Sequence, residues 1–375
     1  MPRVLADVFG GRRGPSLVFI CGIHGNEPAG VFAAERLAPA LERLRPALRG
    51  RVVFLAGNRQ ALAAGARFVR RDLNRGWTQE NLARLRRLPA RELGDEDQEQ
   101  LDLADALRDI ERAQQGPLLV VDLHTTSAPT PPFTCFGDTL KNRRLAMALP
   151  LPATLGLEEV IEGALVGYCT ERGHVGISIE AGRHADPESI EHHVAAAWLL
   201  LVAARCLPAN AVPELAIHRA RLERASASCP RVVEVLHRHV VRPTDNFEML
   251  PGFTNFAPVF AGEEVAHDAH GPVRVAETGL LLMPRYQSQG EDGFFLVREV
   301  RSIWLELSEL LRRAGASRLV PHLPGIHRHE LQPHLLVADP RVARIHLSDV
   351  MHLLGYRRRR SSDERPMFSR RGRAR

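Results

Sequence analysis

Short apolar runs alternate with longer amphipathic segments along the first 200 residues of the chain. The apolar runs are rich in β-branched residues and predict strands at residues 17–23, 51–56, 118–123 and 175–179. The amphipathic segments repeat apolar residues every three or four positions and predict helices at residues 28–44, about 95–114 and 187–206. This alternation of strands and helices indicates an α/β sheet with helices on its faces.

The pattern changes near residues 207–213, where prolines and small residues indicate a joining segment. Strand-like runs with frequent turn signals then predict a small all-β unit, and a later helix is predicted at residues 302–313. We therefore divide the chain into a main domain (1–207), a linker (208–229), a small β-rich domain (230–300), a partly helical extension (301–355) and a basic, disordered tail (356–375).

The composition is that of an ordinary globular protein, with 45% hydrophobic and 25% charged residues. No run of about 18 apolar residues occurs, which argues against a membrane span. The N-terminal segment lacks the apolar core of a signal peptide, so we predict a cytoplasmic protein. Five scattered cysteines without Cys-x-x-Cys spacing predict reduced thiols, in agreement with that compartment.

The formal net charge of +6 raises the question of nucleic-acid binding. Lys141 is the only lysine, so the basic charge is almost entirely arginine, as a compositional bias would produce. Much of the excess lies at residues 357–360 and 370–375. We interpret it as a solvated tail, which disfavours nucleic-acid binding as the main function.

Two of the predicted strands end in residues that bind metals. His24 and Glu27 follow the first strand, and His124 follows the third. The carboxyl ends of strands form the edge at which α/β folds bind their ligands, so these side chains are expected to meet. Two histidines and one glutamate form the ligand set of a catalytic zinc with an open fourth position. We predict one zinc ion per subunit and hence a hydrolase.

Four segments resemble the succinylglutamate desuccinylase/aspartoacylase family. They are His-Gly-Asn-Glu at 24–27, Arg-Phe-Val-Arg-Arg-Asp-Leu-Asn-Arg at 67–75, Asp-Leu-His at 122–124 and Gly-Ile-Ser-Ile-Glu at 176–180. The resemblance covers about residues 15–200 and, more loosely, the β unit to about residue 300. It implies a fold similar to the zinc carboxypeptidases, with a mixed twisted sheet and helices on both faces, and a small all-β barrel-sandwich domain towards the C-terminus.

The resemblance implies roles for residues outside the metal set. Glu180 matches the general base that takes a proton from the zinc-activated water. Arg67 matches the arginine that polarises the scissile carbonyl and stabilises the oxyanion. Asn74 and Arg75 match the pair that binds the substrate carboxylate.

A second carboxylate contact and two nearby histidines are less specific signals. Tyr168 and Arg172 resemble the Tyr-x-x-x-Arg pair that contacts another substrate carboxylate in the family. His174 and His184 flank the fourth predicted strand, and we interpret both as hydrogen-bonded surface residues.

The β unit departs from the family pattern. Animal aspartoacylases carry a tyrosine pair there, of which one contacts the substrate, whereas this chain has Phe294 and Phe295. The loss of a phenolic donor argues against N-acetylaspartate as the substrate. Either Tyr286 replaces the missing contact or the acyl pocket is more apolar.

The residues and the resemblance together predict a zinc-dependent amidohydrolase that cleaves an N-acyl amino acid or a similar small amide bearing a carboxylate. A zinc carboxypeptidase acting on short peptides is the alternative, because both classes use an arginine to bind a carboxylate. A non-enzymatic protein that binds zinc or nucleic acid ranks last, since it gives no reason for Glu180 and Arg67. We expect the protein to bind a small anionic substrate and not to bind a membrane. Whether it forms a homo-oligomer stays an open question.

Overall fold

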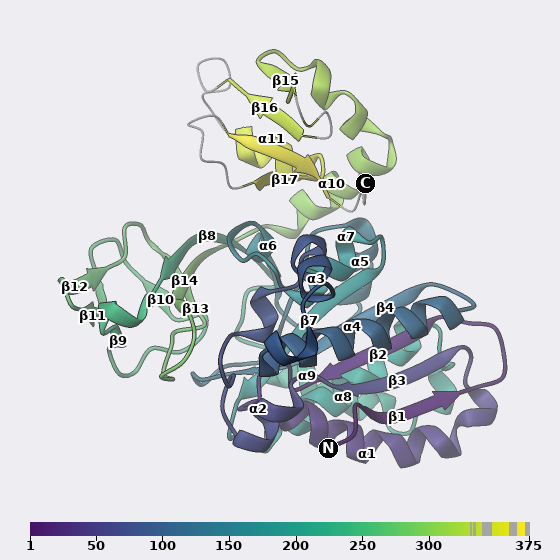
Figure 1. Ribbon diagram of the computed structural model, residues 1–375. Coiled ribbons are helices and arrows are strands. Elements are labelled where there is room, and N and C mark those ends of the chain that lie inside the picture. The colour runs from purple at the N-terminus through teal and green to yellow at the C-terminus, as the bar shows by residue number, and fades with distance from the viewer. Residues whose placement is uncertain (331, 333–334, 340–346, 360–365, 372–375) are drawn as a thin grey trace.

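The computed structural model describes residues 1–330, 332, 335–339, 347–359 and 366–371. Within this part of the chain, an eleven-stranded sheet forms the centre of the molecule, with smaller sheets of three and four strands beside it (Figure 1). The α/β prediction is confirmed, because helices cover the mixed central sheet and the neighbouring strands run both parallel and antiparallel.

The α/β part contributes the first seven strands of the chain to this sheet. They are β1 (Val4–Phe9), β2 (Ser16–Cys21), β3 (Arg51–Ala56), β4 (Leu118–Thr126), β5 (Phe133–Cys135), β6 (Ala153–Leu155) and β7 (Val175–Arg183). Strands β3, β2, β4 and β7 are adjacent and parallel. Every residue of β2 and β4 is buried, as expected for parallel strands that are covered on both faces. The apolar runs of the sequence therefore predicted four of these strands, β2, β3, β4 and β7, whereas β1, β5 and β6 were not predicted.

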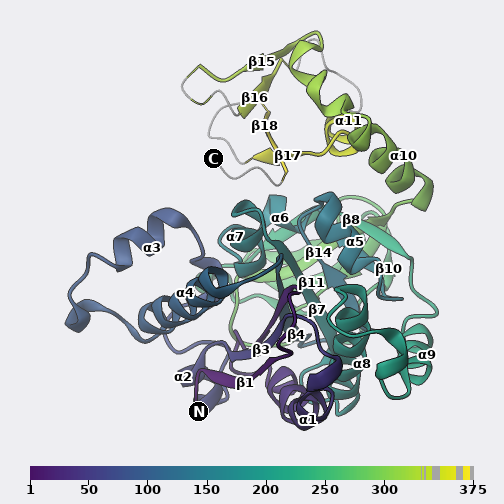
Figure 2. The same cartoon turned by 90° about the vertical axis from the view of Figure 1, so that its right-hand side faces the viewer.

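Long helices cover both faces of the sheet (Figure 2). On one face, α1 (Ala29–Arg43) and α8 (Glu188–Ala203) pack against alternate strand residues such as Phe19 and Val121. On the other, α4 (Asp95–Ala113) packs against Val18 and Val120. The remaining helices of this part are short: α2 (Arg59–Ala64), α3 (Gln79–Leu85), α5 (Leu140–Ala146), α6 (Leu157–Val160), α7 (Leu165–Glu171) and α9 (Leu215–Ala225). The predicted helices on both faces are thus present.

The β unit (residues 230–300) is joined to the central sheet. Strand β8 (Val232–Val240) pairs in parallel with β6, and β14 (Asp292–Glu299), β13 (Gly279–Leu282) and β10 (Pro258–Val259) continue the same sheet. The other three strands, β9 (Glu248–Met249), β11 (Glu264–Asp268) and β12 (Gly271–Arg274), form the separate three-stranded sheet. The predicted all-β character agrees with these strands, whereas the barrel-sandwich form and the domain boundaries stay predictions.

The C-terminal unit (residues 301–371) lies beside α6 and α7 in both views (Figures 1 and 2). Helix α10 (Ser302–Arg313) has the predicted bounds, and α11 (Leu347–Leu353) follows later. The four strands of this unit form a sheet of their own: β15 (Ile326–Arg328), β16 (Leu335–Ala338), β17 (Tyr356–Arg359) and β18 (Met367–Arg370).

The described part of the basic tail differs from the prediction of a disordered segment. Strands β17 and β18 pair with each other, and Arg371 is buried after them. The physical reason is that carboxylates of the α/β part and of the neighbouring elements accept hydrogen bonds from the tail arginines, a long-range pairing that composition does not reveal. The remaining tail residues, 360–365 and 372–375, lie outside the described part of the chain.

Charged side chains fix the C-terminal unit to the α/β part. The buried carboxylate of Asp138 accepts hydrogen bonds from Arg143 (2.7 Å), Arg371 (2.9 Å) and Arg312 (3.1 Å). Burial alone would raise the pKa of Asp138, but the three guanidinium groups hold it below its usual range. Arg371 also contacts Glu159 at 2.6 Å. The Asp138 carboxylate therefore holds two parts of the C-terminal unit, Arg312 of α10 and Arg371 after β18.

His352 in α11 makes the stability of the contact between the C-terminal unit and the rest of the protein depend on pH. Its ring nitrogens lie 2.8 Å from Glu234 and 3.0 Å from Glu159. Burial opposes protonation, but these hydrogen bonds raise the pKa of His352 to about 9. The charged imidazole therefore stabilises the folded protein fully below its unfolded pKa of about 6.5, and this stabilisation is lost as the pH rises through about 9.

We expect His352→Gln to lower the free energy of unfolding by up to about 3 kcal/mol near pH 6, and by much less near pH 10. Urea unfolding of both proteins at the two pH values measures this difference. An equal loss of stability at both pH values would show that the imidazole charge contributes nothing.

All five cysteines are free, as predicted, and four of them are buried. Among the described helices, none combines the length and the apolar character that crossing a membrane requires.

Candidate metal centre and active-site cavity

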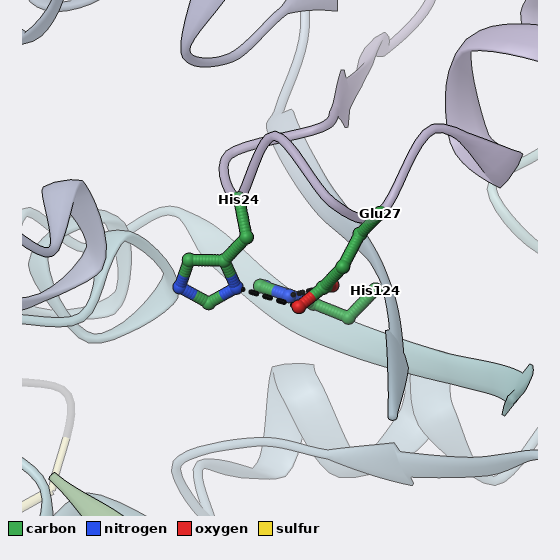
Figure 3. A group of neighbouring side chains, drawn as sticks. All are labelled: His24, Glu27 and His124. Carbon is green, nitrogen blue, oxygen red and sulfur yellow. Dashed lines mark hydrogen bonds and ion pairs between the residues drawn. The ribbon is translucent and has the colours of Figure 1, made fainter. Parts of the chain in front are cut away.

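The three predicted metal ligands lie together at the carboxyl edge of the central sheet. His24 and Glu27 belong to the loop between β2 and α1, and His124 lies in β4, the parallel neighbour of β2. Figure 3 shows both imidazole rings directed at the Glu27 carboxylate. The Nδ1 atoms of His24 and His124 lie 2.9 and 3.0 Å from its two oxygens. All three side chains are buried, and their ligand atoms lie within 4.8 Å of one another.

The second ring nitrogen of each histidine faces another carboxylate. His24 Nε2 lies 3.1 Å from Asp72 Oδ1, and His124 Nε2 lies 2.9 Å from Asp122 Oδ2. The hydrogen bond to Asp72 keeps the proton of His24 on Nε2, which leaves its Nδ1 lone pair for a metal. Two Nδ1 atoms and one carboxylate that converge in this way fit a catalytic zinc with one open position.

Asp72 links the ligands to Arg67. Its Oδ2 atom accepts a hydrogen bond from Arg67 Nη2 at 2.9 Å, and Arg67 Nη1 lies 3.5 Å from Glu27 Oε1. Burial alone would raise the pKa of Asp72, but Arg67 and His24 hold it well below its usual range. The structure therefore brings Arg67 beside the predicted ligands, and its role with the substrate stays a prediction. Asp72 was not predicted to have a role, although an acidic residue among the arginines of residues 67–75 was a signal.

Glu180 in β7 is aligned with His124 across the two parallel strands. It is buried and lines the same cavity as the metal ligands. Burial raises the pKa of Glu180 to about 8, with Glu27 and Asp122 adding to the rise and His124 and Arg67 opposing it. A carboxyl group with such a pKa exchanges its proton near neutrality, which suits a general acid and base.

Asn74 and Arg75 line the same cavity. The buried Asn74 accepts a hydrogen bond from the Leu165 amide at 2.8 Å, and its Nδ2 atom lies 3.4 Å from His124 Nε2. Arg75 donates to Asp292 of β14 at 2.6 Å. Its Nε atom is buried and has no hydrogen-bond partner in the described part of the chain. Arg75 thus keeps a free donor near the cavity that it lines.

Tyr168 and Arg172 are neighbours, but only Tyr168 lines the cavity. Tyr168 lines the cavity, whereas Arg172 follows the end of α7, is not part of the cavity wall and forms an ion pair with Glu111 at 2.6 Å. Arg172 also lies over the Tyr168 ring, 5.6 Å from its centroid. The contact of these residues with a substrate carboxylate stays a prediction, and the position of Arg172 gives it no support.

The loop between β13 and β14 covers the metal site and was not predicted from the sequence. Gln287 Oε1 accepts a hydrogen bond from Asn26 at 2.9 Å and lies 3.2 Å from His184 Nε2. The other ring nitrogen of His184 lies 2.8 Å from the Thr125 hydroxyl. Gln289 accepts from the Arg67 amide at 3.0 Å. The run of polar residues between two apolar strands was the feature of the sequence that could have indicated this loop.

The candidate replacement for the missing tyrosine lies elsewhere. The Tyr286 hydroxyl donates to the Leu250 carbonyl at 2.7 Å and accepts from the Phe253 amide at 3.0 Å, and Tyr286 is not part of the cavity wall. Phe294 and Phe295 are buried in the β unit. The structure therefore gives Tyr286 no role in the cavity.

A cavity of about 880 Å³ contains the metal ligands, Glu180, Arg67, Asn74 and Arg75. It extends from these residues to the C-terminal unit, which contributes part of its wall.

A comparison with protein families matches residues 13–197 to the succinylglutamate desuccinylase/aspartoacylase catalytic domain. The succinylglutamate desuccinylase of Pseudomonas paraeruginosa is 47% identical over 64 residues, which are 16% of this chain and 19% of that protein. The enzyme of the same name from Pseudomonas putida is 44% identical over 64 residues, 16% of this chain and 18% of that protein. The match thus spans less than a fifth of these curated relatives.

Solved structures with similar folds cover more of the chain. A succinylglutamate desuccinylase of Vibrio parahaemolyticus covers 88% of this chain and 86% of its own, with a TM-score of 0.55 and 16% identity. A succinylglutamate desuccinylase/aspartoacylase of Rhodobacter sphaeroides has a TM-score of 0.57 and 19% identity, and covers 78% of this chain and 87% of its own. An ectoine utilization protein of Ruegeria pomeroyi, solved with product, has the same coverage and identity and a TM-score of 0.56. At these identities the likeness shows the fold alone.

Proposed function

Because the chain belongs to the succinylglutamate desuccinylase/aspartoacylase family, we propose that it is a zinc-dependent amidohydrolase of N-acyl amino acids or similar small amides bearing a carboxylate. The observation that carries this proposal is the convergence of His24, Glu27 and His124 in one buried group. Glu180 lies on the adjacent strand and lines the same cavity, which places a proton acceptor where a hydrolase needs one.

The residues of the cavity supply the steps of amide hydrolysis. Zinc held by the two histidines and Glu27 would supply Lewis acidity towards a water molecule and the amide carbonyl. Glu180 takes the proton from the attacking water and delivers it to the leaving amine nitrogen. Arg67, fixed by Asp72, stabilises the negative charge that develops on the carbonyl oxygen.

Proton transfer through Glu180 fits its surroundings. Without a cation in the site, burial raises its pKa to about 8. A divalent cation favours the ionised form and lowers this pKa. Glu180 is therefore a base when the attack begins, and its buried position lets it hold the proton until the amine leaves.

Arg75 and Asn74 orient the carboxylate of the substrate. The buried Arg75 Nε atom has no hydrogen-bond partner among the described residues, and a carboxylate is the acceptor that suits a guanidinium group. Asp292 accepts a hydrogen bond from Nη2 of the same guanidinium at 2.6 Å, so the side chain is oriented before substrate binds. The loop that carries Gln287 and Gln289 covers the site and limits access of bulk water.

The proposal is tested with purified protein, its zinc content and a panel of N-acyl amino acids, with the released amine as the readout. Dipeptides are assayed in parallel, since preferential cleavage of dipeptides would instead support the carboxypeptidase alternative. A non-enzymatic zinc- or nucleic-acid-binding protein would cleave neither class. A wild-type protein that binds zinc but hydrolyses no member of either class contradicts the proposal.

We expect Glu27→Ala to lower the zinc content from about one ion per chain to nearly none, because it removes one of three ligands and the acceptor between the two histidines. Hydrolysis should be lost with the metal. Elemental analysis after desalting measures the zinc content. Glu35→Ala is the matched control, since Glu35 is an exposed residue of α1 and its variant should keep both metal and activity.

A further inference from the structure

One side chain of the covering loop between β13 and β14 is held in a fixed orientation in the cavity wall. Gln287 lines the active-site cavity, and its Oε1 atom lies 2.9 Å from Asn26 Nδ2 and 3.2 Å from His184 Nε2. A carboxamide oxygen has two acceptor positions, and these two neighbours occupy both. The Nε2 atom of Gln287 points away from them and meets no acceptor in the described part of the chain. Gln287 therefore keeps a free amide donor in the cavity wall.

His184 connects this carboxamide to the metal ligands. Because a carboxamide oxygen only accepts, His184 Nε2 carries the proton that it donates to Gln287. The Nδ1 atom of His184 then accepts from the Thr125 hydroxyl at 2.8 Å. The backbone amide of Thr125 donates to Glu27 Oε2 at 3.0 Å. The orientation of Gln287 is thus tied to one of the predicted ligands through a short chain of hydrogen bonds.

The amide nitrogen of Gln287 borders the same space as the Arg67 side chain. A Cβ atom added to Gly290 would lie 3.6 Å from Arg67 Nε and 3.8 Å from Gln287 Nε2, and all three residues line the cavity. Gln289 holds the loop in this place, because it accepts from the Arg67 amide at 3.0 Å and donates to the Phe68 carbonyl at 3.1 Å. The side chains of Arg67 and Gln287 therefore present donors to the same part of the cavity.

Two neighbouring donors of this kind suit an oxygen atom that gains negative charge. In amide hydrolysis the carbonyl oxygen becomes that atom when water attacks the carbonyl carbon. Arg67 directs Nε and Nη2 at Asp72, at 3.1 and 2.9 Å, which leaves Nη1 as its donor towards the cavity. A carboxamide that is oriented before the reaction adds a second donor and needs no rearrangement as the charge develops.

We propose that Gln287 is a catalytic residue, whose carboxamide donates a hydrogen bond beside Arg67 to the carbonyl oxygen of the scissile amide, and that His184 is the positioning residue that orients it. This inference rests on the proposed hydrolytic function. The hydrogen bond strengthens as the oxygen becomes negative, so it acts on kcat more than on KM.

The test uses two substitutions of Gln287 and the best N-acyl amino acid of the panel. Gln287→Met keeps the length of the side chain but removes both the donor and the acceptor. Gln287→Glu keeps an acceptor for Asn26 and His184 but has no amide donor. Both should lower kcat about 100-fold, the usual effect of removing one oxyanion donor, with KM changed by less than about threefold. The zinc content of both variants should match that of the wild type.

The matched control is Gln98→Met, which changes an exposed glutamine of α4 outside the cavity whose amide donates to Asp102 of the same helix. It should keep wild-type kinetics. A wild-type kcat in Gln287→Glu would show that the side chain only fastens the loop, and a wild-type kcat in Gln287→Met would show that it contributes nothing. Either result, or an equal fall in the control, overturns the proposal.

The positioning role of His184 is measured with a double-mutant cycle. His184→Phe should lower kcat about tenfold in the wild-type background, because Gln287 loses the donor that orients it. In the Gln287→Met background the same substitution should lower kcat by less than about twofold. An equal fall in both backgrounds would show that His184 supports the structure independently of Gln287, and it would overturn this assignment.

A binding measurement distinguishes failure of this inference from failure of the proposed function. If the wild-type protein hydrolyses no N-acyl amino acid, acetohydroxamate is titrated into the zinc-loaded wild type and both Gln287 variants by calorimetry. Its carbonyl oxygen is the acceptor that tests the donor. A Kd that is about fivefold or more higher in both variants, as expected for one lost hydrogen bond, supports the donor without catalysis. Equal binding by the three proteins, or no binding to the wild type, overturns it.

Discussion

Glu180→Gln is expected to lower kcat for the best N-acyl amino acid by about three orders of magnitude while zinc stays bound. General acid–base catalysis contributes about 10²- to 10⁴-fold, and the amide of glutamine neither accepts the proton of the attacking water nor returns it to the amine. Glutamine has the shape of glutamate, and none of the proposed ligands is changed. Steady-state kinetics and the zinc content of the same preparation measure the two effects.

The control for this prediction is Glu188→Gln, which neutralises an exposed carboxylate of α8 that pairs with Arg221. It should retain wild-type turnover and metal content. Wild-type turnover by Glu180→Gln would exclude Glu180 as the general base. Loss of zinc together with activity would show instead that the side chain supports the metal site.

Asp138→Ala should lower the free energy of unfolding by about 3–5 kcal/mol, the usual effect of removing one partner from a buried ionic group. The reason is that Arg143, Arg312 and Arg371 share this carboxylate, and their side chains are less than 10% exposed. Without it, three guanidinium groups stay buried around an empty position. Urea unfolding followed by circular dichroism measures the change.

Asp109→Ala removes an acidic residue of α4 that is 72% exposed and lies 3.8 Å from Arg112. Such surface pairs contribute at most about 1 kcal/mol, so this variant should unfold almost as the wild type does. If Asp138→Ala were equally mild, the carboxylate would not be the anchor of the C-terminal unit.

The sequence predicted the central strands because each is a continuous apolar run. Residues of β3 match the predicted range, and β4 and β7 extend beyond the predicted ends at residues 123 and 179. The extensions carry His124 and Glu180, whose polar side chains made the runs look shorter. Strand β1 was not predicted, because much of this edge strand is exposed and lacks a clear apolar pattern.

The site was predictable where residues follow strands and unpredictable where distant loops meet. His24, Glu27 and His124 follow from the rule that strand ends share one edge. The contact of Gln289 with Arg67 joins residues 222 positions apart, and that of Arg371 with Asp138 joins residues 233 apart. No periodicity or local spacing encodes such pairs, so the covering loop and the ordered tail emerge only from the structure.

The pairing of β8 with β6 determines how the molecule can open. Because of this pairing, the strands near the metal ligands and the strands that flank the covering loop belong to one hydrogen-bonded sheet. Moving the covering loop together with its strands would therefore break backbone hydrogen bonds. The sheet of the C-terminal unit is separate, and α10 follows β14 after a short connection between residues 299 and 302. Because Asp138 accepts hydrogen bonds from Arg312 and Arg371, rotation of the C-terminal unit about this connection would break a buried ionic group, so this unit is expected to stay in place during turnover.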